Sequence, residues 1–355
     1  MMRPEDAPAV ARIYAARLRS GREVDLDLVA RRLVRSYFEH PWPDPEIRPW
    51  ICETGTGQII GFLGVTARPL RWGKRTLRAA IIGNLVVDEE HGGAGASHTI
   101  INEFLEGPQD LAISDHALDV TRKISDRFGG ATIRLLSLDW DLQLRPASIT
   151  LDRRVGRRFN RVAQGLAPVA NAIDTLGRRI ERGPWWVERN DCEVRPLSMA
   201  RLAELISHLG GDAITPIYDK DSLAWVMATP RGHGRGLRAR EVLNERGHTL
   251  GCFVHYVDRD SEVLHLGAEL GAGERVFECL VADAISANAR ALNGRISPAL
   301  MREMSSKGVR YQINRWFILH TKRPEIVAAF HSGDTYFSRL DGERWSMRFV
   351  DIDDE

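Results

Sequence analysis

The feature that most constrains this chain is a repeated order of predicted elements. Two helices, three strands separated by turns and one further helix are predicted within residues 5–105. A similar order begins again after Cys192, which gives a repeat spacing of roughly 185 residues. Repeats of this kind are structural units that arise by internal duplication. We therefore predict an α/β fold built twice, each copy being a mostly antiparallel mixed sheet flanked by helices.

The first copy is predicted from hydrophobic periodicity and turn residues. Apolar residues recur with a helical period over residues 5–38, and Pro41, Pro43 and Pro45 then end the helical pattern. The strands predicted next are Trp50–Glu53, Ile59–Arg68 and Arg78–Val87, followed by a helix from Gly95 to Leu105. A strand over Leu111–Ser114, a helix over Ala117–Phe128 and a strand over Thr132–Leu138 complete this copy.

The second copy defines the expected domain boundaries. Its strands are predicted at Arg238–Asn244, Thr249–Val257 and Glu262–Ala268, with a helix following from Glu274 and a closing hairpin over Phe337–Trp345. We expect an N-terminal domain over residues 1–146, a basic helical linker over 147–190 and a degenerate second copy over 191–355.

Composition excludes several classes of function. The 355 residues are 43% hydrophobic and 27% charged, with a net charge of only +1, so no overall field favours nucleic acid. The four cysteines have no closely spaced pair, and neither a signal peptide nor a transmembrane run is evident. We expect a cytoplasmic protein. Residues 151–186 are read either as a solvated helix between domains or as a weak membrane-surface contact, and a homodimer is left open.

The glycine-rich loop, residues 91–96, carries the chemical prediction. It follows an apolar strand ending in Val86 and Val87 and precedes an amphipathic helix. At such a junction the free backbone N–H groups converge on the positive end of the helix dipole, and small residues let a phosphate reach the backbone. The residues of the loop are His91, Gly92, Gly93, Ala94, Gly95 and Ala96.

These residues resemble the signature of the GCN5-related N-acetyltransferase (GNAT) superfamily, Arg/Gln-x-x-Gly-x-Gly/Ala. The start Arg3-Pro4-Glu5-Asp6 and the element order of residues 1–138 are also similar to that superfamily. The resemblance implies that the loop binds the pyrophosphate of an acyl-coenzyme A (acyl-CoA) and that Val86 and Val87 hold the thioester. It implies transfer of an acyl group, with acetyl-CoA as the expected donor, to an amine of a small molecule or a cell-envelope precursor. Related tandem proteins are the Fem-type transferases and mycothiol synthase.

Candidate catalytic groups lie at the end of the predicted strand. Asp88, Glu89 and Glu90 are candidate bases that take a proton from an ammonium substrate, and Asn84 either polarises the substrate or is structural. Superfamily members often use a tyrosine of the helix after the next strand, but residues 117–128 contain none, so His116 or Ser114 is the candidate acid.

Two alternatives remain open from the sequence. His91 and Ala94 depart from the signature and the tyrosine is missing, which favours a second reading as a non-catalytic ligand-binding, regulatory or assembly protein. The second copy has a similar loop over Leu266–Arg275, but without the six-residue match, so the first copy is favoured as the cofactor site. His248, His255 and His265 complete no metal-ligand spacing, and no metal is expected.

Overall fold

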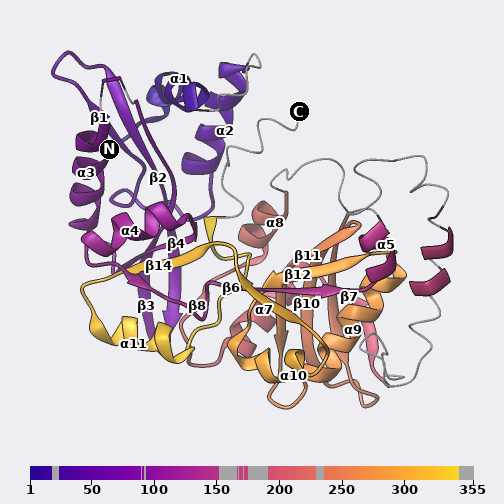
Figure 1. Cartoon of the computed structure of the whole chain (residues 1–355). Helices are drawn as coiled ribbons and strands as arrows, with labels where there is room; N and C mark the ends of the chain where they lie inside the picture. The colour runs from indigo at the N-terminus through magenta and orange to yellow at the C-terminus, as the bar shows by residue number, and fades with distance from the viewer. Residues whose placement is uncertain are drawn as a thin grey trace. The chain divides into compact units, whose positions relative to one another are not determined.

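The computed structural model describes residues 1–17, 24–88, 90–91, 93–151, 166, 168–170, 172–174, 191–228 and 236–343 (Figure 1). The described residues form two compact units, each made of segments distant in sequence. Unit 1 contains residues 1–137, 206–233 and 315–355, and unit 2 contains residues 138–205 and 234–314. Most of the predicted linker helix and of its predicted membrane contact, residues 151–186, lies outside the described residues.

Unit 1 is built on a mixed sheet with the order β1-β2-β3-β4-β14-β5, and β8 pairs with β2 beside this path. Its strands are β1 (Trp50–Glu53), β2 (Ile59–Trp72), β3 (Arg75–Val87), β4 (Leu111–Ala117), β5 (Ala131–Thr132), β8 (Thr215–Pro216) and β14 (Trp316–His320). Its helices are η1 (Pro4–Asp6), α1 (Ala7–Arg17), α2 (Leu26–Phe38), α3 (Gly93–Leu105), α4 (Asp119–Arg127), α8 (Lys220–Ala228) and α11 (Pro324–Ser332).

Side-chain alternation along the strands assigns the helices of unit 1 to opposite faces of its sheet. Phe62 and Val86 pack with α1 and α2, whereas Leu63 and Ala80 pack with α3. Further along the first face, a cluster around Phe330 holds α11 against the sheet. Successive strand residues point to opposite faces, so both faces of the central strands are buried.

Unit 2 repeats this plan on a second sheet, with the order β13-β6-β12-β11-β10-β9-β7. Its strands are β6 (Leu138–Gln143), β7 (Glu193–Pro196), β9 (Gly236–Leu243), β10 (Thr249–Val257), β11 (Asp260–Ala268), β12 (Ala291–Arg295) and β13 (Arg310–Ile313). Its helices are α5 (Pro146–Leu151), α9 (Gly273–Ser286), η3 (Pro298–Leu300) and α10 (Met301–Ser305), and α7 (Met199–Gly210) crosses the boundary between the units.

The division of strands between the two sheets does not follow their order in the sequence. β6 follows β5 in the chain but belongs to the second sheet, whereas β14 comes late in the chain and pairs with β4 in the first. The expected domain limits 1–146, 147–190 and 191–355 stay a prediction about independent folding, but they do not coincide with this division into sheets.

Two local predictions were wrong. The predicted strand Thr132–Leu138 is interrupted, because residues 134–137 form a turn between β5 and β6. The predicted closing hairpin over Phe337–Trp345 is absent from the described residues 337–343, which contain no strand. Buried side chains fix this segment instead: Asp341 accepts hydrogen bonds from Tyr218 and Ser338.

The predicted fold class is confirmed: the structure has two mixed sheets with flanking helices, and the order of helix and strand types in the first copy matches the prediction as far as the strand at residue 132. Within the described part of the chain, no helix is both long enough and apolar enough to cross a membrane.

Candidate functional site

The neighbouring strands β3 and β4 of unit 1 separate part-way along their length. Their parallel pairing covers only Ala79–Ile81 of β3 and Leu111–Ile113 of β4. Both strands continue, to Val87 and to Ala117, with no further pairing between them in the described ladder. The result is a gap in the middle of the sheet rather than at its edge.

A β-bulge marks the point of separation. Leu63 of β2 pairs with Leu85, and Val65 pairs with Ile82, so β3 carries one extra residue at Gly83–Asn84. On the opposite strand, a Cβ on Gly64 would come within 2.1 Å of the Tyr37 hydroxyl. Because bulges bend a strand and increase its local twist, this irregularity turns β3 away from β4.

Backbone groups of β3 face the gap. The Asp88 N–H donates to the Ile60 carbonyl at 2.9 Å, on the side of β2. Residues of an antiparallel strand alternate in the direction of their N–H groups. The N–H groups of Leu85 and Val87 therefore point into the gap, whereas that of Val86 points to β2. Of the two predicted thioester-binding residues, Val87 is thus the one whose N–H faces the gap.

The glycine-rich loop joins β3 to the first turn of α3. Gly93 begins the helix with φ +49°, a conformation that favours glycine, and its N–H donates to the Asp88 carbonyl at 3.1 Å. Cβ atoms added at Gly93 or Gly95 would meet no other atom within 4 Å. Open space therefore lies beside the backbone at the positive end of the helix, where an anion is stabilised.

The carboxylate of Asp88 is used within this loop. It accepts hydrogen bonds from the backbone N–H groups of Glu90 at 2.9 Å and of His91 at 3.3 Å, and it lies 3.0 Å from the His91 Nδ1. The bond to the His91 side chain, together with these backbone bonds, lowers the pKa of Asp88. In this arrangement Asp88 holds the loop and does not line the pocket described below.

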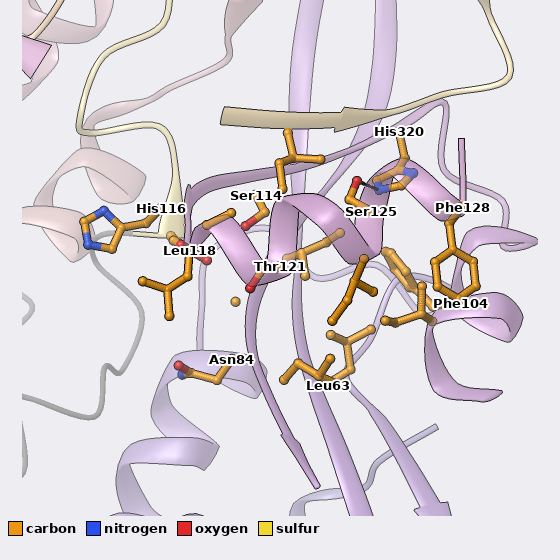
Figure 2. A pocket seen from close by; sticks show the side chains of 18 of the residues that line it. Leu63, Asn84, Phe104, Ser114, His116, Leu118, Thr121, Ser125, Phe128 and His320 are labelled. Atoms are coloured by element: carbon orange, nitrogen blue, oxygen red, sulfur yellow. Dashed lines mark hydrogen bonds between the residues drawn. The ribbon is translucent and has the colours of Figure 1, made fainter. Parts of the chain in front are cut away.

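The gap opens into a pocket of about 390 Å³ between α3, α4 and the separated strands. Figure 2 shows Asn84 and His116 at one end and Phe104 and Phe128 at the other. This size falls within the usual range of small-molecule sites, about 300–1,000 Å³. A mostly apolar wall with a few polar groups is also typical of such sites.

The polar end of the pocket brings together residues from three parts of the chain. Asn84 comes from the bulge, Ser114 and His116 from β4, and Glu343 from the segment after α11. The Glu343 N–H donates to the buried carboxylate of Asp115 at 2.7 Å. A Cβ on Gly342 would come within 2.1 Å of both oxygens of Asp115. Residue 342 must therefore be glycine for Glu343 to reach the gap.

Tyr37 lies close to this polar end, on the α2 side of the sheet. Burial raises the pKa of Tyr37 well above its ordinary value, and the charge of Glu343 raises it further while Asn84 opposes the rise. The phenol therefore stays protonated at physiological pH.

A polar side-chain pair lies toward the apolar end of the pocket. Ser125 of α4 and His320 of β14 lie 2.7 Å apart, between Oγ and Nε2, and both line the pocket. Burial lowers the pKa of His320 to about 4, so the imidazole is neutral at physiological pH.

The predicted site residues are distributed unevenly around the pocket. His116 and the considered alternatives Asn84 and Ser114 line it. Glu90 is exposed, Ala96 is buried against the sheet and Ala94 lies in α3, while Glu89 and Gly92 lie outside the described residues. Sequence reasoning missed Glu343 and the Ser125–His320 pair, because nothing in a single sequence indicates that residues 316–343 return to the first sheet. It also missed Tyr37, because the approach of its hydroxyl to Gly64 depends on how α2 packs on β2.

In unit 2 the strands separate in a similar way, but protein side chains occupy the space at the start of the following helix. β11 and β12 pair only over Asp260–Val263 and Ala291–Gly294, and β11 has a bulge opposite Val254 and His255. Here, however, a Cβ on Gly273, at the start of α9, would come within 2.6 Å of Leu300. Lys307 also forms ion pairs with Glu274 at 2.9 Å and Glu278 at 2.5 Å, so α9 already has carboxylates in its first turns.

The predicted hairpin histidines of unit 2 have ordinary partners. His255 is fully buried between Ser261 at 3.1 Å and Asp283 at 2.8 Å, and His248 lies 2.8 Å from Glu269. Burial lowers the pKa of His265 to about 4. Among the residues that the structure covers, no group of three potential ligands is arranged to hold a metal ion. The Ser261 hydroxyl is itself fully buried and donates to the Tyr256 carbonyl, so it is not a nucleophile open to substrate.

Comparison with known proteins supports this description of the fold. No family model and no curated protein sequence matches the chain. Solved structures do match. A probable N-acyltransferase of Enterococcus faecalis V583 and a GCN5-related N-acetyltransferase of Anabaena variabilis both have a TM-score of 0.57, at 9% and 10% identity. In each case 90% of this chain covers 71% of the other.

A third match is a GCN5-related N-acetyltransferase of Kribbella flavida, with a TM-score of 0.53, 15% identity, and coverage of 90% of this chain and 69% of the other. The predicted resemblance to the GNAT superfamily is confirmed at the level of the fold. At these identities the likeness extends to the fold alone.

Proposed function

We propose that the protein transfers an acyl group from an acyl-CoA to an amine, and that unit 1 holds the cofactor. The observation that carries this proposal is the gap between β3 and β4. Backbone N–H groups of β3 face it on one wall, and it opens beside a glycine-lined helix N-terminus. A pantetheine arm has two amide groups, which can pair with a strand edge as another strand would. Its pyrophosphate can then reach the loop at residues 91–96.

The polar end of the pocket supplies the chemistry for direct attack. The N–H groups of Leu85 and Val87 face the gap, so either can stabilise the oxyanion of a tetrahedral intermediate. Among the pocket-lining groups, the Glu343 carboxylate and His116 are the candidates for taking the proton of the attacking amine. Of the bases predicted from the sequence, Asp88 and Glu90 lie at the loop, which we propose binds the cofactor, and Glu89 lies outside the described residues.

The identities of the acceptor and of the acyl group are proposed from the sequence alone. We retain the proposal of a small-molecule or cell-envelope amine as acceptor, with acetyl as the acyl group expected from the resemblance. The competing function is a non-catalytic protein that binds an acyl-CoA as a ligand.

Binding is tested first with the whole protein. A ligand present at about 100-fold its dissociation constant stabilises the folded state by about 2.7 kcal/mol, which is visible as a rise in melting temperature. We expect acyl-CoAs to produce this rise. Thiol release with a panel of amines then separates an enzyme from a binding protein. The absence of a thermal shift with every acyl-CoA would exclude both the acyltransferase and the non-catalytic acyl-CoA-binding protein.

A matched pair of variants locates the site. Gly93 and Gly271 both have positive φ, at +49° and +77°, and neither has an atom within 4 Å of an added Cβ. Gly93→Glu and Gly271→Glu therefore carry a similar conformational cost, about 1–2 kcal/mol. We expect only Gly93→Glu to abolish binding, because its carboxylate would occupy the phosphate position. Equal effects of both variants would contradict a cofactor site in unit 1.

A further inference from the structure

The pocket of unit 1 extends well beyond the groups that would handle a thioester. Its far end lies between the last turn of α3 and the end of α4, where Phe104, Leu105, Ile124 and Phe128 form the wall. In Figure 2 this end is separate from Asn84 and His116. The wall therefore continues past the reacting centre as an apolar chamber, defined here by Ile101, Phe104, Leu105, Ile124, Phe128 and Ile318.

The geometry of a bound thioester determines what can enter this chamber. The sulfur must lead back toward the loop at residues 91–96, where the pyrophosphate is placed. The carbonyl oxygen must point to the N–H groups on β3. The remaining substituent of the carbonyl carbon is the acyl chain, and the direction left for it is toward the apolar chamber.

We propose that the chamber binds an apolar acyl chain several carbons longer than acetyl. This inference rests on the proposed function and makes its donor more specific. An acetyl group would leave apolar walls without contacts, and such a cavity is costly because the surrounding side chains lose their packing partners. A longer chain fills it. The Ser125–His320 pair, at 2.7 Å, lies toward the far end and, in this proposal, closes it and sets an upper limit to the chain.

Equilibrium binding to the full-length protein tests the inference. The probes are CoA itself and its acetyl, butyryl, hexanoyl, octanoyl and decanoyl thioesters. We expect affinity to rise by roughly fourfold per added methylene, the value that corresponds to its transfer out of water. It should stop rising once the chain reaches the closed end. If CoA and all the thioesters bind within about twofold of one another, the chamber does not receive the chain, although the proposed function stands. If none of them binds, the proposed function fails as well.

Two variants distinguish binding in the chamber from non-specific adsorption of a hydrophobic ligand. Ile124→Trp fills the chamber from α4, and we expect the gain in affinity of octanoyl- and decanoyl-CoA over CoA to disappear. Val120→Trp is the matched control on the same helix, because Val120 is 60% exposed and does not line the pocket. It should leave the length preference unchanged.

Phe104→Leu enlarges the chamber and does not depend on accommodating a larger side chain. We expect it to move the preferred chain to a longer one, the direction opposite to Ile124→Trp. A length preference that neither variant alters would overturn the proposal, because the binding would then lie elsewhere on the protein.

Discussion

At the scale of single residues, the site depends on close contacts that only small side chains permit. Gly64 makes room for the Tyr37 hydroxyl beside the bulge, and Gly342 allows the next residue, Glu343, to pass the Asp115 carboxylate. Each contact lets a polar group from outside the strands approach the gap: Tyr37 from α2 and Glu343 from the segment after α11. The chemistry of the pocket therefore depends on glycines that do not themselves react.

Glu343 gives the prediction at this scale. If its carboxylate takes the proton of the amine, Glu343→Gln should lower kcat by about 10²- to 10⁴-fold, while the KM for acyl-CoA changes little because the loop at residues 91–96 is untouched. Steady-state thiol release with an acceptor found in the amine panel measures both constants.

The control for this experiment is Glu325→Gln, because Glu325 is an exposed carboxylate of α11 paired with Arg323. An unchanged kcat in Glu343→Gln, combined with a large loss in His116→Gln, would assign the role of base to His116 instead.

At the scale of elements, the sequence predicted what is local. The glycines, the apolar strand before them and the helical period after them are contiguous, so β3, the loop and α3 could be placed from residues 78–105. The bulge at Gly83–Asn84 could not, because it depends on how β2 and β3 register against each other. Nor could Glu343, because its position depends on a segment more than 200 residues after β4.

β14 is the element on which the first sheet depends. It pairs with β4 on one side and β5 on the other. Its Phe317 and Leu319 pack into the cluster around Phe330, on the face of the sheet that α11 covers. A fragment of residues 1–146, the domain expected from the sequence, lacks this strand and α11. We expect it to lack a cooperative thermal transition, because an open β4 edge and an apolar face would be exposed.

Calorimetry or circular dichroism of the fragment checks this prediction. The comparison is the same fragment produced together with residues 147–355, in which β14 is available and a cooperative transition should return. A sharp transition in the fragment alone would show that the sequence-based boundary does define an independent domain.

At the scale of the whole molecule, buried histidines link stability to pH. Burial lowers the pKa of His40, His265 and His320 to about 4 each, and the charge of Arg68 contributes at His40. Below the ordinary histidine pKa of 6.5 the unfolded chain binds protons at these sites, whereas the folded chain does not until about pH 4. Stability should therefore fall as pH decreases through this window.

We expect the free energy of unfolding at about pH 5 to be lower than at about pH 7.5, by on the order of 1–2 kcal/mol per histidine. Asp341 acts in the opposite direction, because burial raises its pKa. Urea unfolding at the two pH values measures the difference, and His320→Gln should reduce it by one histidine's share. An unfolding free energy that is equal at both pH values would contradict the buried neutral state of these rings.

The place of β14 in the first sheet also determines when that sheet can be completed during synthesis. During synthesis β4 is complete once Ala117 has emerged, but its partner begins only at Trp316. At about 5–20 residues per second, roughly 10–40 s separate the two. Throughout that interval the nascent first sheet lacks the strand that pairs with β4 and β5, and the segment carrying Glu343 has not been made. The pocket therefore cannot form co-translationally from residues 1–146 alone, and the proposed cofactor can meet a complete site only after Glu343 has left the ribosome.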